Sequence, residues 1–313
     1  MTERRSRSSL VEWIVTSSQR MRGRVVEPTV AAFADPARLA YGSWRVALRS
    51  DRRAVAGTVL LVALTVMSIY GAVARPLIGR ASEALRAPSS AHWFGTDDGG
   101  RDVFFALVHG AYPTLGAAIA AMIGAAGLGI ALGSLGGFLR GAPDLVIQRT
   151  IEALTAIPLL VVVLIAQTLL PVASWSLILI VMFTRWADVA QVVRADVLRV
   201  MQLEHVTAAR ALGAGPGRLL ARHVLPSVLA SAVILTAFGV GTVIVVETAI
   251  AVIGIGFVHP LAWGAILGQS RAHPEAWWLV LFPAGFVAIT LGATVMLGEA
   301  MRDAFDPRLR WNR

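Results

Sequence analysis

The sequence of 313 residues contains no cysteine and no lysine. Without cysteine the chain forms no disulfide, no thiolate metal site and no cysteine nucleophile. Without lysine it has no P-loop, because that motif places a lysine against the phosphates of the bound nucleotide. If ATP drives this protein, another chain must therefore hydrolyse it.

Charged residues are also scarce, at 15% of the chain against 56% hydrophobic residues. A soluble domain would carry about a quarter charged residues, so the composition predicts a polytopic membrane protein. All 28 basic residues are arginine, and the pI is near 11.4. These arginines flank apolar segments, which indicates a role in orienting the chain in a membrane, and we expect no nucleic-acid partner.

Six apolar segments are candidates for crossing the hydrocarbon core, which takes about 20 residues of helix. The predicted spans cover residues 54–74, 112–139, 153–171, 174–190, 224–254 and 276–298. With both termini cytoplasmic, 23 of the 28 arginines lie on the cytoplasmic side. The positive-inside rule favours this orientation. The sequence thus predicts an all-α polytopic protein of the plasma or inner membrane with six transmembrane helices.

The chain is expected to divide into four parts. Residues 1–38 form a basic cytoplasmic tail, and residues 39–111 form an interfacial helix, the first transmembrane helix and an extracytoplasmic segment. The remaining transmembrane domain covers residues 112–305, with a cytoplasmic loop at 185–223, and residues 306–313 form a second cytoplasmic tail. Small residues repeat every four positions in the second span, which predicts close helix packing; they are Ala125, Gly129, Gly133 and Gly137.

The loop 185–223 contains the most informative stretch of the sequence. Residues 204–212 are mostly good helix formers, and Gly213 suits the position just after a helix end, where glycine adopts a left-handed backbone. A turn at 213–217 then precedes a second helical run that begins at Arg218. The small side chains of Ala208 and Ala209 would allow another protein to approach the helix backbone closely.

This spacing resembles the EAA loop of ABC importer permeases, in which Glu-Ala-Ala is followed by a glycine and later by Leu-Pro. Thr207 replaces the glutamate of that pattern, and His223 replaces an isoleucine. In the family the loop forms a coupling helix that docks into a groove of a cytoplasmic ATPase subunit. An ordinary amphipathic connector between spans is the alternative. The resemblance implies ATPase-coupling roles for Glu204, Thr207, Ala208, Ala209, Arg210, Leu212, Gly213 and Ala214.

A second dense motif precedes the second span. Residues 95–100 predict a turn, Asp97 and Asp98 are expected to cap the following helix, and Arg101 is expected to pair with a nearby carboxylate. The run resembles the FGTDxxGRDV signature of the dipeptide, oligopeptide and nickel branch of these permeases, in the C-type subunit. A calcium site is the alternative, although the acidic residues lack a regular ligand spacing. The residues of this extracytoplasmic motif are Gly95, Thr96, Asp97, Asp98, Gly100, Arg101 and Asp102.

Three further stretches resemble the same family, at residues 149–158, 252–264 and 298–308. With five motifs in family order, the chain is identified as a member of the ABC importer permeases, with their type I fold. The resemblance implies a non-enzymatic permease subunit of an ATP-driven, binding-protein-dependent importer for dipeptides, oligopeptides, a nickel complex or haem. Its implied partners are a homologous B-type permease, two ATPase subunits that bind ATP and Mg, and an extracytoplasmic substrate-binding protein. The chain itself is expected to bind no cofactor and no metal.

Glu247 lies within the predicted fifth span. An ionisable group inside the bilayer is costly and marks a candidate functional site. It either holds the span to a neighbouring helix or contacts the substrate in the translocation pathway.

An ion-coupled secondary transporter would use Glu247 with Glu152 and Arg185 as a relay, but such transporters are built from inverted repeats, which the sequence does not show. An intramembrane hydrolase would need a nucleophile and a base paired within the spans, and His109 with scattered serines and threonines does not supply them.

Two other groups of side chains are expected at membrane interfaces. Trp277 and Trp278, at the start of the sixth span, are predicted to be interface anchors. Arg185, Asp188 and Arg194 are predicted to form ion pairs at the cytoplasmic interface. The six histidines show no metal-ligand spacing.

Overall fold

The computed structural model describes residues 52–73, 83–169, 174–254 and 259–305, all within the compact unit Gly42–Arg313. Every element longer than an isolated bridge in these ranges is a helix, and the bridge pairs Thr96 with Asp102. The predicted tails at 1–38 and 306–313 and the interfacial helix before residue 52 lie outside the described residues.

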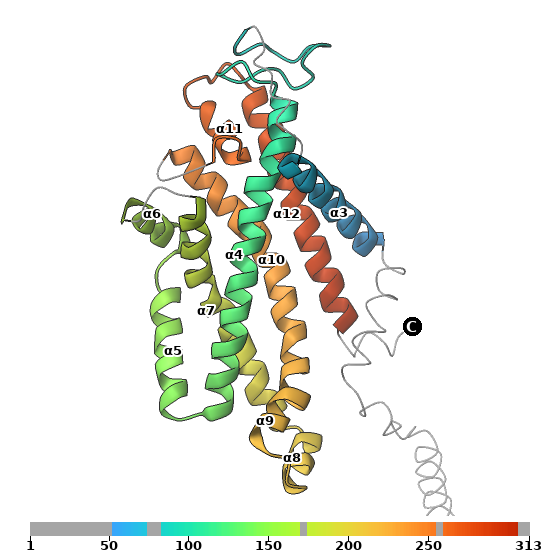
Figure 1. The fold of residues 1–313 in the computed structure, drawn as a ribbon, viewed down its shortest axis with the longest axis vertical. Coiled ribbons are helices and arrows are strands. Elements are labelled where there is room, and N and C mark those ends of the chain that lie inside the picture. Colours follow the sequence, from blue (N-terminus) through green and yellow to red (C-terminus); the bar gives the residue numbers. More distant parts are fainter. Residues whose placement is uncertain (1–51, 74–82, 170–173, 255–258, 306–313) are drawn as a thin grey trace, which may run out of the picture. The chain divides into compact units, whose positions relative to one another are not determined.

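Five of the described helices are long and apolar enough to cross a membrane. They correspond to the predicted first, second, fourth, fifth and sixth spans (Figure 1). The second begins at Val103 rather than at residue 112, and the fourth continues to Val200 rather than ending near residue 190. The helices are α3 (Arg52–Val73), α4 (Val103–Leu139), α7 (Ser174–Val200), α10 (Leu225–Ile253) and α12 (Trp278–Phe305).

The predicted third span is broken. Residues 142–169 form α5 (Ala142–Thr155) and α6 (Leu159–Leu169), which meet at an angle of 88°. Pro158 explains the break, because proline lacks a backbone N–H and disfavours the helical conformation in the residue before it. The prediction of one continuous helix over 153–171 was therefore wrong. The spans number six when this bent pair is counted as one crossing.

Helices α4 and α7 share the most extensive contact between described elements. The glycines of α4 face α7: a Cβ atom on Gly133 would lie 2.6 Å from the carbonyl oxygen of Ala190. A Cβ atom on Gly137 would lie 2.8 Å from the Cβ atom of Val197. The predicted close packing along this row of small residues is confirmed, and it fixes α7 against α4 as far as the end that leads into α8.

Short elements connect the long helices at the two ends of the bundle (Figure 1). At one end, α8 (Glu204–Ala211), α9 (Pro216–Leu219) and a π-helical turn (Leu220–Val224) join α7 to α10. At the other end, α11 (Trp263–Gln269) follows α10 and lies beside the turn at 83–102. The buried Trp263 holds α11 to α4, since its Nε1 donates a hydrogen bond to the carbonyl oxygen of Leu107 at 2.8 Å.

Candidate functional site

Helix α8 is anchored to the bundle by a single fully buried side chain. Val206 has no exposed surface and packs in an apolar cluster with Val200, Leu219 and Val224. Ala209 and Ala214 pack partly against the same cluster. The predicted helix over 204–212 is confirmed to within one residue, and one face of it is fixed to the ends of α7 and α10.

The rest of α8 faces away from the chain. Glu204, Thr207, Ala208 and Arg210 are exposed. Leu212, directly after the helix, is 89% exposed, the largest value among the exposed large hydrophobic side chains of the described residues. A small helix thus presents methyl groups, charge and one large apolar side chain on a surface that the described part of the chain leaves uncovered.

Gly213 ends this helix, as the sequence predicts. Its φ of +82° lies in the left-handed region, and its N–H donates to the carbonyl oxygen of Arg210 at 3.0 Å. The N–H of Ala214 then donates to the carbonyl oxygen of Ala209, also at 3.0 Å. A Cβ atom on Gly213 would meet nothing within 4 Å, so backbone conformation and not crowding makes glycine suitable here.

The connection from α7 into α8 is hydrogen-bonded throughout. The N–H of Met201 donates to the carbonyl oxygen of Val197, and that of Leu203 donates to Val200. The N–H of Val206 in turn donates to Leu203 at 3.0 Å. Because each residue between the two helices donates such a bond, α8 is joined to the end of α7 without an unsupported segment.

The end of the bundle that carries α8 is basic. In the stretch 199–223 four arginines are exposed and a single glutamate, Glu204, is the only acidic residue. The ring of His205 lies 5.9 Å, between centroids, from that of His223. The exposed arginines are Arg199, Arg210, Arg218 and Arg222.

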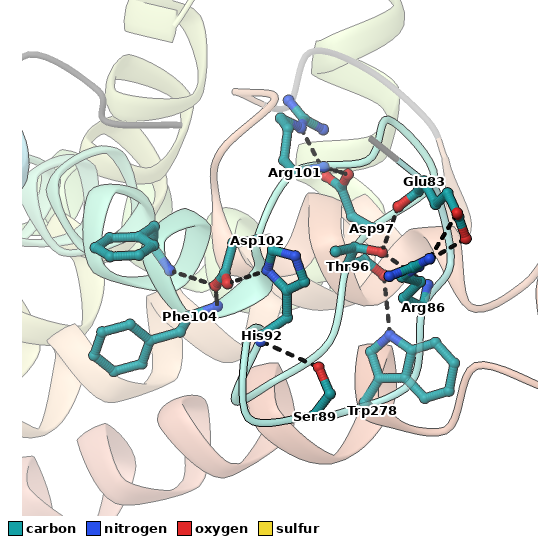
Figure 2. A network of polar contacts seen from close by, with 11 residues as sticks. Glu83, Arg86, Ser89, His92, Thr96, Asp97, Arg101, Asp102, Phe104 and Trp278 are labelled. Atoms are coloured by element: carbon teal, nitrogen blue, oxygen red, sulfur yellow. Dashed lines mark hydrogen bonds and ion pairs between the residues drawn. The ribbon is translucent and has the colours of Figure 1, made fainter. Parts of the chain in front are cut away.

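The motif at residues 95–102 forms a closed turn (Figure 2), which lies at the opposite end of the bundle from α8 (Figure 1). Asp97 has no exposed surface, and its Oδ1 accepts hydrogen bonds from the N–H groups of Gly99 (3.0 Å) and Arg101 (2.8 Å). Its Oδ2 accepts from Nε of Arg101 at 2.7 Å. The predicted ion pair of Arg101 is therefore confirmed. Since these donors bond to both carboxylate oxygens, Asp97 has a structural role within the turn.

The same turn is tied to α12 through the buried Thr96. Its hydroxyl accepts from the N–H of Arg86 at 2.8 Å, and its carbonyl oxygen accepts from Nε1 of Trp278 at 3.0 Å (Figure 2). Trp278 is only 5% exposed, whereas Trp277 is 52% exposed. The prediction that both tryptophans are interface anchors was therefore wrong for Trp278, whose indole belongs to the core. Gly95 leaves room for it, because a Cβ atom there would lie 2.9 Å from its Nε1.

Asp102, and not Asp97 or Asp98, caps the following helix α4. Its Oδ1 accepts from the N–H groups of Phe104 (2.9 Å) and Phe105 (3.3 Å), and its Oδ2 lies 2.8 Å from Nδ1 of His92. The predicted caps were wrong because the turn closes on Asp97 before the helix begins. The side chain of Asp98 is exposed, and only its N–H approaches Gln269 of α11, at 3.4 Å.

Glu247 lies in α10 and is 6% exposed. Its Oε2 accepts no hydrogen bond from any described residue. Within the four described ranges, no three histidine, aspartate or glutamate side chains gather as metal ligands. One residue further along α10, the Cα atom of Thr248 would lie 2.9 Å from a Cβ atom on Gly264, so α11 packs closely against this part of α10.

The three residues predicted to form interfacial ion pairs do so with different partners. Arg185 pairs with Asp188 on the same helix at 2.6 Å. Arg194 instead pairs with Asp144, fifty positions earlier in the sequence, and Nη2 of Arg194 lies 2.8 Å from Oδ2 of Asp144. The sequence interpretation missed this partner. The run Gly141, Ala142, Pro143 and Asp144 is a helix-start signal, but it carries no information on which helix the carboxylate meets.

Comparison with known proteins finds close relatives. Residues 110–311 match the family described as binding-protein-dependent transport system inner membrane component. The chain is 32% identical over 307 residues to the oligopeptide transport system permease protein OppC of Bacillus subtilis (strain 168), covering 93% of this chain and 99% of that protein. It is 31% identical over 307 residues to the dipeptide transport system permease protein DppC of the same strain, covering 96% and 93%. It is 31% identical over 225 residues to the glutathione transport system permease protein GsiD of Pectobacterium atrosepticum, covering 71% and 75%.

Proposed function

The chain belongs to the family of binding-protein-dependent transport system inner membrane components, and on that premise we propose that it is the C-type permease subunit of an ATP-driven peptide importer. Membership makes it a component of a membrane transport system, and we propose that it has no enzymatic activity of its own. Its similarity to ABC permeases over nearly the whole chain does not support the alternative of an ion-coupled secondary transporter.

The substrate class rests on the relatives. The three compared above are named for oligopeptide, dipeptide and glutathione transport, and these substrates share peptide bonds and charged termini. We therefore propose short peptides as the substrate, in preference to the nickel complex or haem that the sequence motifs also allow. A substrate-binding protein outside the membrane would select the peptide and deliver it.

The observation that carries the proposal is the construction of α8. One face is fixed to the bundle by Val206, the connection to α7 is hydrogen-bonded, and the remaining surface is exposed. A rigid element of this kind transmits a change when a partner contacts it differently in two states. We propose that α8 and the following turn dock on an ATPase subunit, through Glu204, Thr207, Ala208, Ala209, Arg210, Leu212, Gly213 and Ala214. Two such ATPase subunits would bind ATP and Mg, and a homologous B-type permease would complete the pathway.

This assignment fixes the proposed orientation. The α8 end and both tails, residues 1–38 and 306–313, would lie in the cytoplasm, and the turn at 83–102 would face the outside. The four exposed arginines of the α8 end support this, since cytoplasmic loops are enriched in basic residues. Residues 112–305 would then form the transmembrane domain, with residues 185–223 as its coupling loop.

The docking role is tested by Ala208→Arg and Gly213→Pro in the reconstituted importer. Ala208→Arg places a long charged side chain on the exposed face. Gly213→Pro fixes φ near −65° where +82° is needed, and it removes the N–H bonded to Arg210. We expect uptake to fall by about 100-fold with ATPase subunits lost or uncoupled, a coupling energy of about 3 kcal/mol.

The matched control for this experiment is Ala87→Arg, an exposed alanine at the opposite end of the bundle. It should retain the ATPase subunits and their basal ATP hydrolysis. If Ala208→Arg and Gly213→Pro transport as well as Ala87→Arg does, the docking assignment is wrong. If the wild-type chain takes up peptide without any ATPase subunit, the whole proposal fails.

Glu247 is proposed to belong to the translocation pathway. An acid that is 6% exposed and leaves Oε2 without a described partner is costly for a purely structural role. The test is Glu247→Gln, which keeps the shape and removes the charge. Unchanged uptake of peptides with a cationic terminus would rule out a role in recognising substrate charge.

A further inference from the structure

One ion pair joins the short helix α5 to the long helix α7 at the end of the bundle that carries α8. Among pairs whose two residues are both described, the others link positions no more than ten apart, whereas Asp144 and Arg194 are fifty apart. Both Nε and Nη2 of Arg194 donate to the carboxylate, so the pair has the two-pronged geometry that fixes orientation as well as distance. The side chains are 24% and 18% exposed, so solvent screens the pair only partly.

The pair lies where three helices meet. Asp144 stands in the first turn of α5, where the helix dipole favours a negative charge, and Arg194 stands in the last third of α7. Helix α4 completes the site with the buried Gly136, where a Cβ atom would lie 3.2 Å from Oδ1 of Asp144. The backbone between α4 and α5 is also constrained, since Arg140 (φ +55°) and Gly141 (φ +67°) are both left-handed. The site therefore holds the carboxylate in one place.

Apolar contacts also hold α5, against both α4 and α7. Ile151 is its only fully buried residue and packs with Trp186 and Ala190 of α7, and the partly buried Ile147 and Leu154 pack against the same cluster. The ion pair holds the beginning of α5, and these apolar contacts hold the rest of it. Loss of the ion pair would therefore remove the charged attachment of the beginning of α5, and α6 is joined to α5 through the 88° bend.

We propose that Asp144 and Arg194 are positioning residues for transport, through which movement of α8 is passed to α5 and α6. The inference rests on the proposed function, since it takes α8 as the docking element. The route is continuous: α8 is hydrogen-bonded to the end of α7, Arg194 lies within α7, and its guanidinium holds α5. Helix α6 in turn contacts α10, the helix that carries Glu247. The pair thus links the docking surface to a broken span beside the proposed pathway.

The experiment compares Arg194→Gln, Asp144→Asn, the double variant and Arg194→Lys in the reconstituted importer. Each single variant leaves one charge without its partner, so we expect uptake per ATP hydrolysed to fall about tenfold in both. The double variant removes both charges and should be no worse than either single one, because the two residues act as a unit. Arg194→Lys keeps the positive charge but cannot donate from two nitrogens to the carboxylate, so its uptake per ATP hydrolysed should lie between those of wild type and Arg194→Gln. The matched control is Arg199→Gln. The side chain of Arg199 is 72% exposed and pairs with Asp196 within α7, so an importer with this variant should transport normally.

A second measurement separates a positioning role from a purely structural one. Because the chain has no cysteine, His205→Cys on α8 and Val146→Cys on α5, both exposed and both outside the proposed docking residues, give single sites for an environment-sensitive label. We expect both labels to respond to ATP in the otherwise wild-type importer. With Arg194→Gln added, the label on α8 should still respond and the label on α5 should not.

An unchanged response of the α5 label in the Arg194→Gln background would overturn the proposal. So would a loss of uptake in the single variants that only matches a loss of assembled importer. If the α8 label fails to respond to ATP even with Arg194 intact, the proposed docking function fails first.

Discussion

The turn at 83–102 and the α8 region lie at the two ends of the helix bundle (Figure 1), and they are built in opposite ways. In the turn, Asp97 and Thr96 are fully buried and their oxygens bond to donors of the same chain. In α8, only Val206 is fully buried, while Leu212 is 89% exposed. The buried oxygens of the turn find their hydrogen-bond donors within the chain, whereas most of the surface of α8 is not covered by other described residues.

This difference distinguishes a motif that maintains the fold from one that meets a partner. Buried polar groups bonded within the chain stabilise a local structure, and changing them lowers stability. Exposed groups on a rigid support contribute little to stability and much to binding. The predictions below separate the two effects, in order of expected size.

Asp97→Ala should give the largest loss of stability. It removes the acceptor of two N–H groups and of the Arg101 guanidinium, at a cost of about 2–4 kcal/mol. The midpoint of thermal unfolding of the detergent-purified chain measures the effect. Asp98→Ala is the matched control, because that neighbouring side chain is exposed, and it should change stability by less than about 0.5 kcal/mol. Equal effects of the two variants would show that the turn is not self-contained.

Val206→Ala should lower the stability of the chain less than Asp97→Ala does, and it should lower peptide uptake more. Removing two methyl groups from a fully buried site costs about 2 kcal/mol, and it loosens the only buried anchor of α8. We expect uptake per assembled importer to fall severalfold, measured beside thermal unfolding. Thr207→Ala, the exposed neighbour, is the control for stability. A Val206→Ala importer that unfolds earlier yet transports fully would contradict the need for a fixed α8.

Trp278→Phe tests the tie between the turn and α12. One aromatic ring is kept, but the pyrrole part of the buried indole and its hydrogen bond to the carbonyl oxygen of Thr96 are lost, which costs about 1–2 kcal/mol. Thermal unfolding should show this loss, and Trp277→Phe, at a half-exposed site, should show almost none. If Trp277→Phe is the more damaging change, the assignment of Trp278 to the core is wrong.

His259 should give the smallest effect, visible only against pH. Partial burial lowers its pKa below the ordinary value of 6.5, so the folded chain resists protonation there. Stability from this group is present above pH 6.5 and is lost as the pH falls through 6.5 toward the lowered value. His259→Asn does not titrate, so its unfolding midpoint should drop slightly less than that of wild type between pH 7.5 and 5.5. An identical drop would show that His259 contributes nothing to this dependence.

The sequence predicted features with a local cause and missed those made by distant contacts. The end of α8 is local, because Gly213 adopts a conformation that glycine favours, and it was located to within one residue. The α4–α7 packing followed from the row of small residues. The 88° bend at Pro158 has a local cause but was not predicted, because the apolar residues that follow the proline favour a membrane span over 153–171. The pairs Asp144–Arg194 and Thr96–Trp278 join residues 50 and 182 positions apart, and no local pattern specifies them.

The most direct test of the account is the accessibility of position 212 to a water-soluble thiol reagent. With no native cysteine, Leu212→Cys and the distant control Ala87→Cys each introduce a single exposed thiol. The account predicts that both react in the chain alone, and that ATPase subunits protect position 212 but leave position 87 reactive. Equal labelling of position 212 with and without bound ATPase subunits, in an importer that still takes up peptide, would contradict the assignment of α8 as the docking surface.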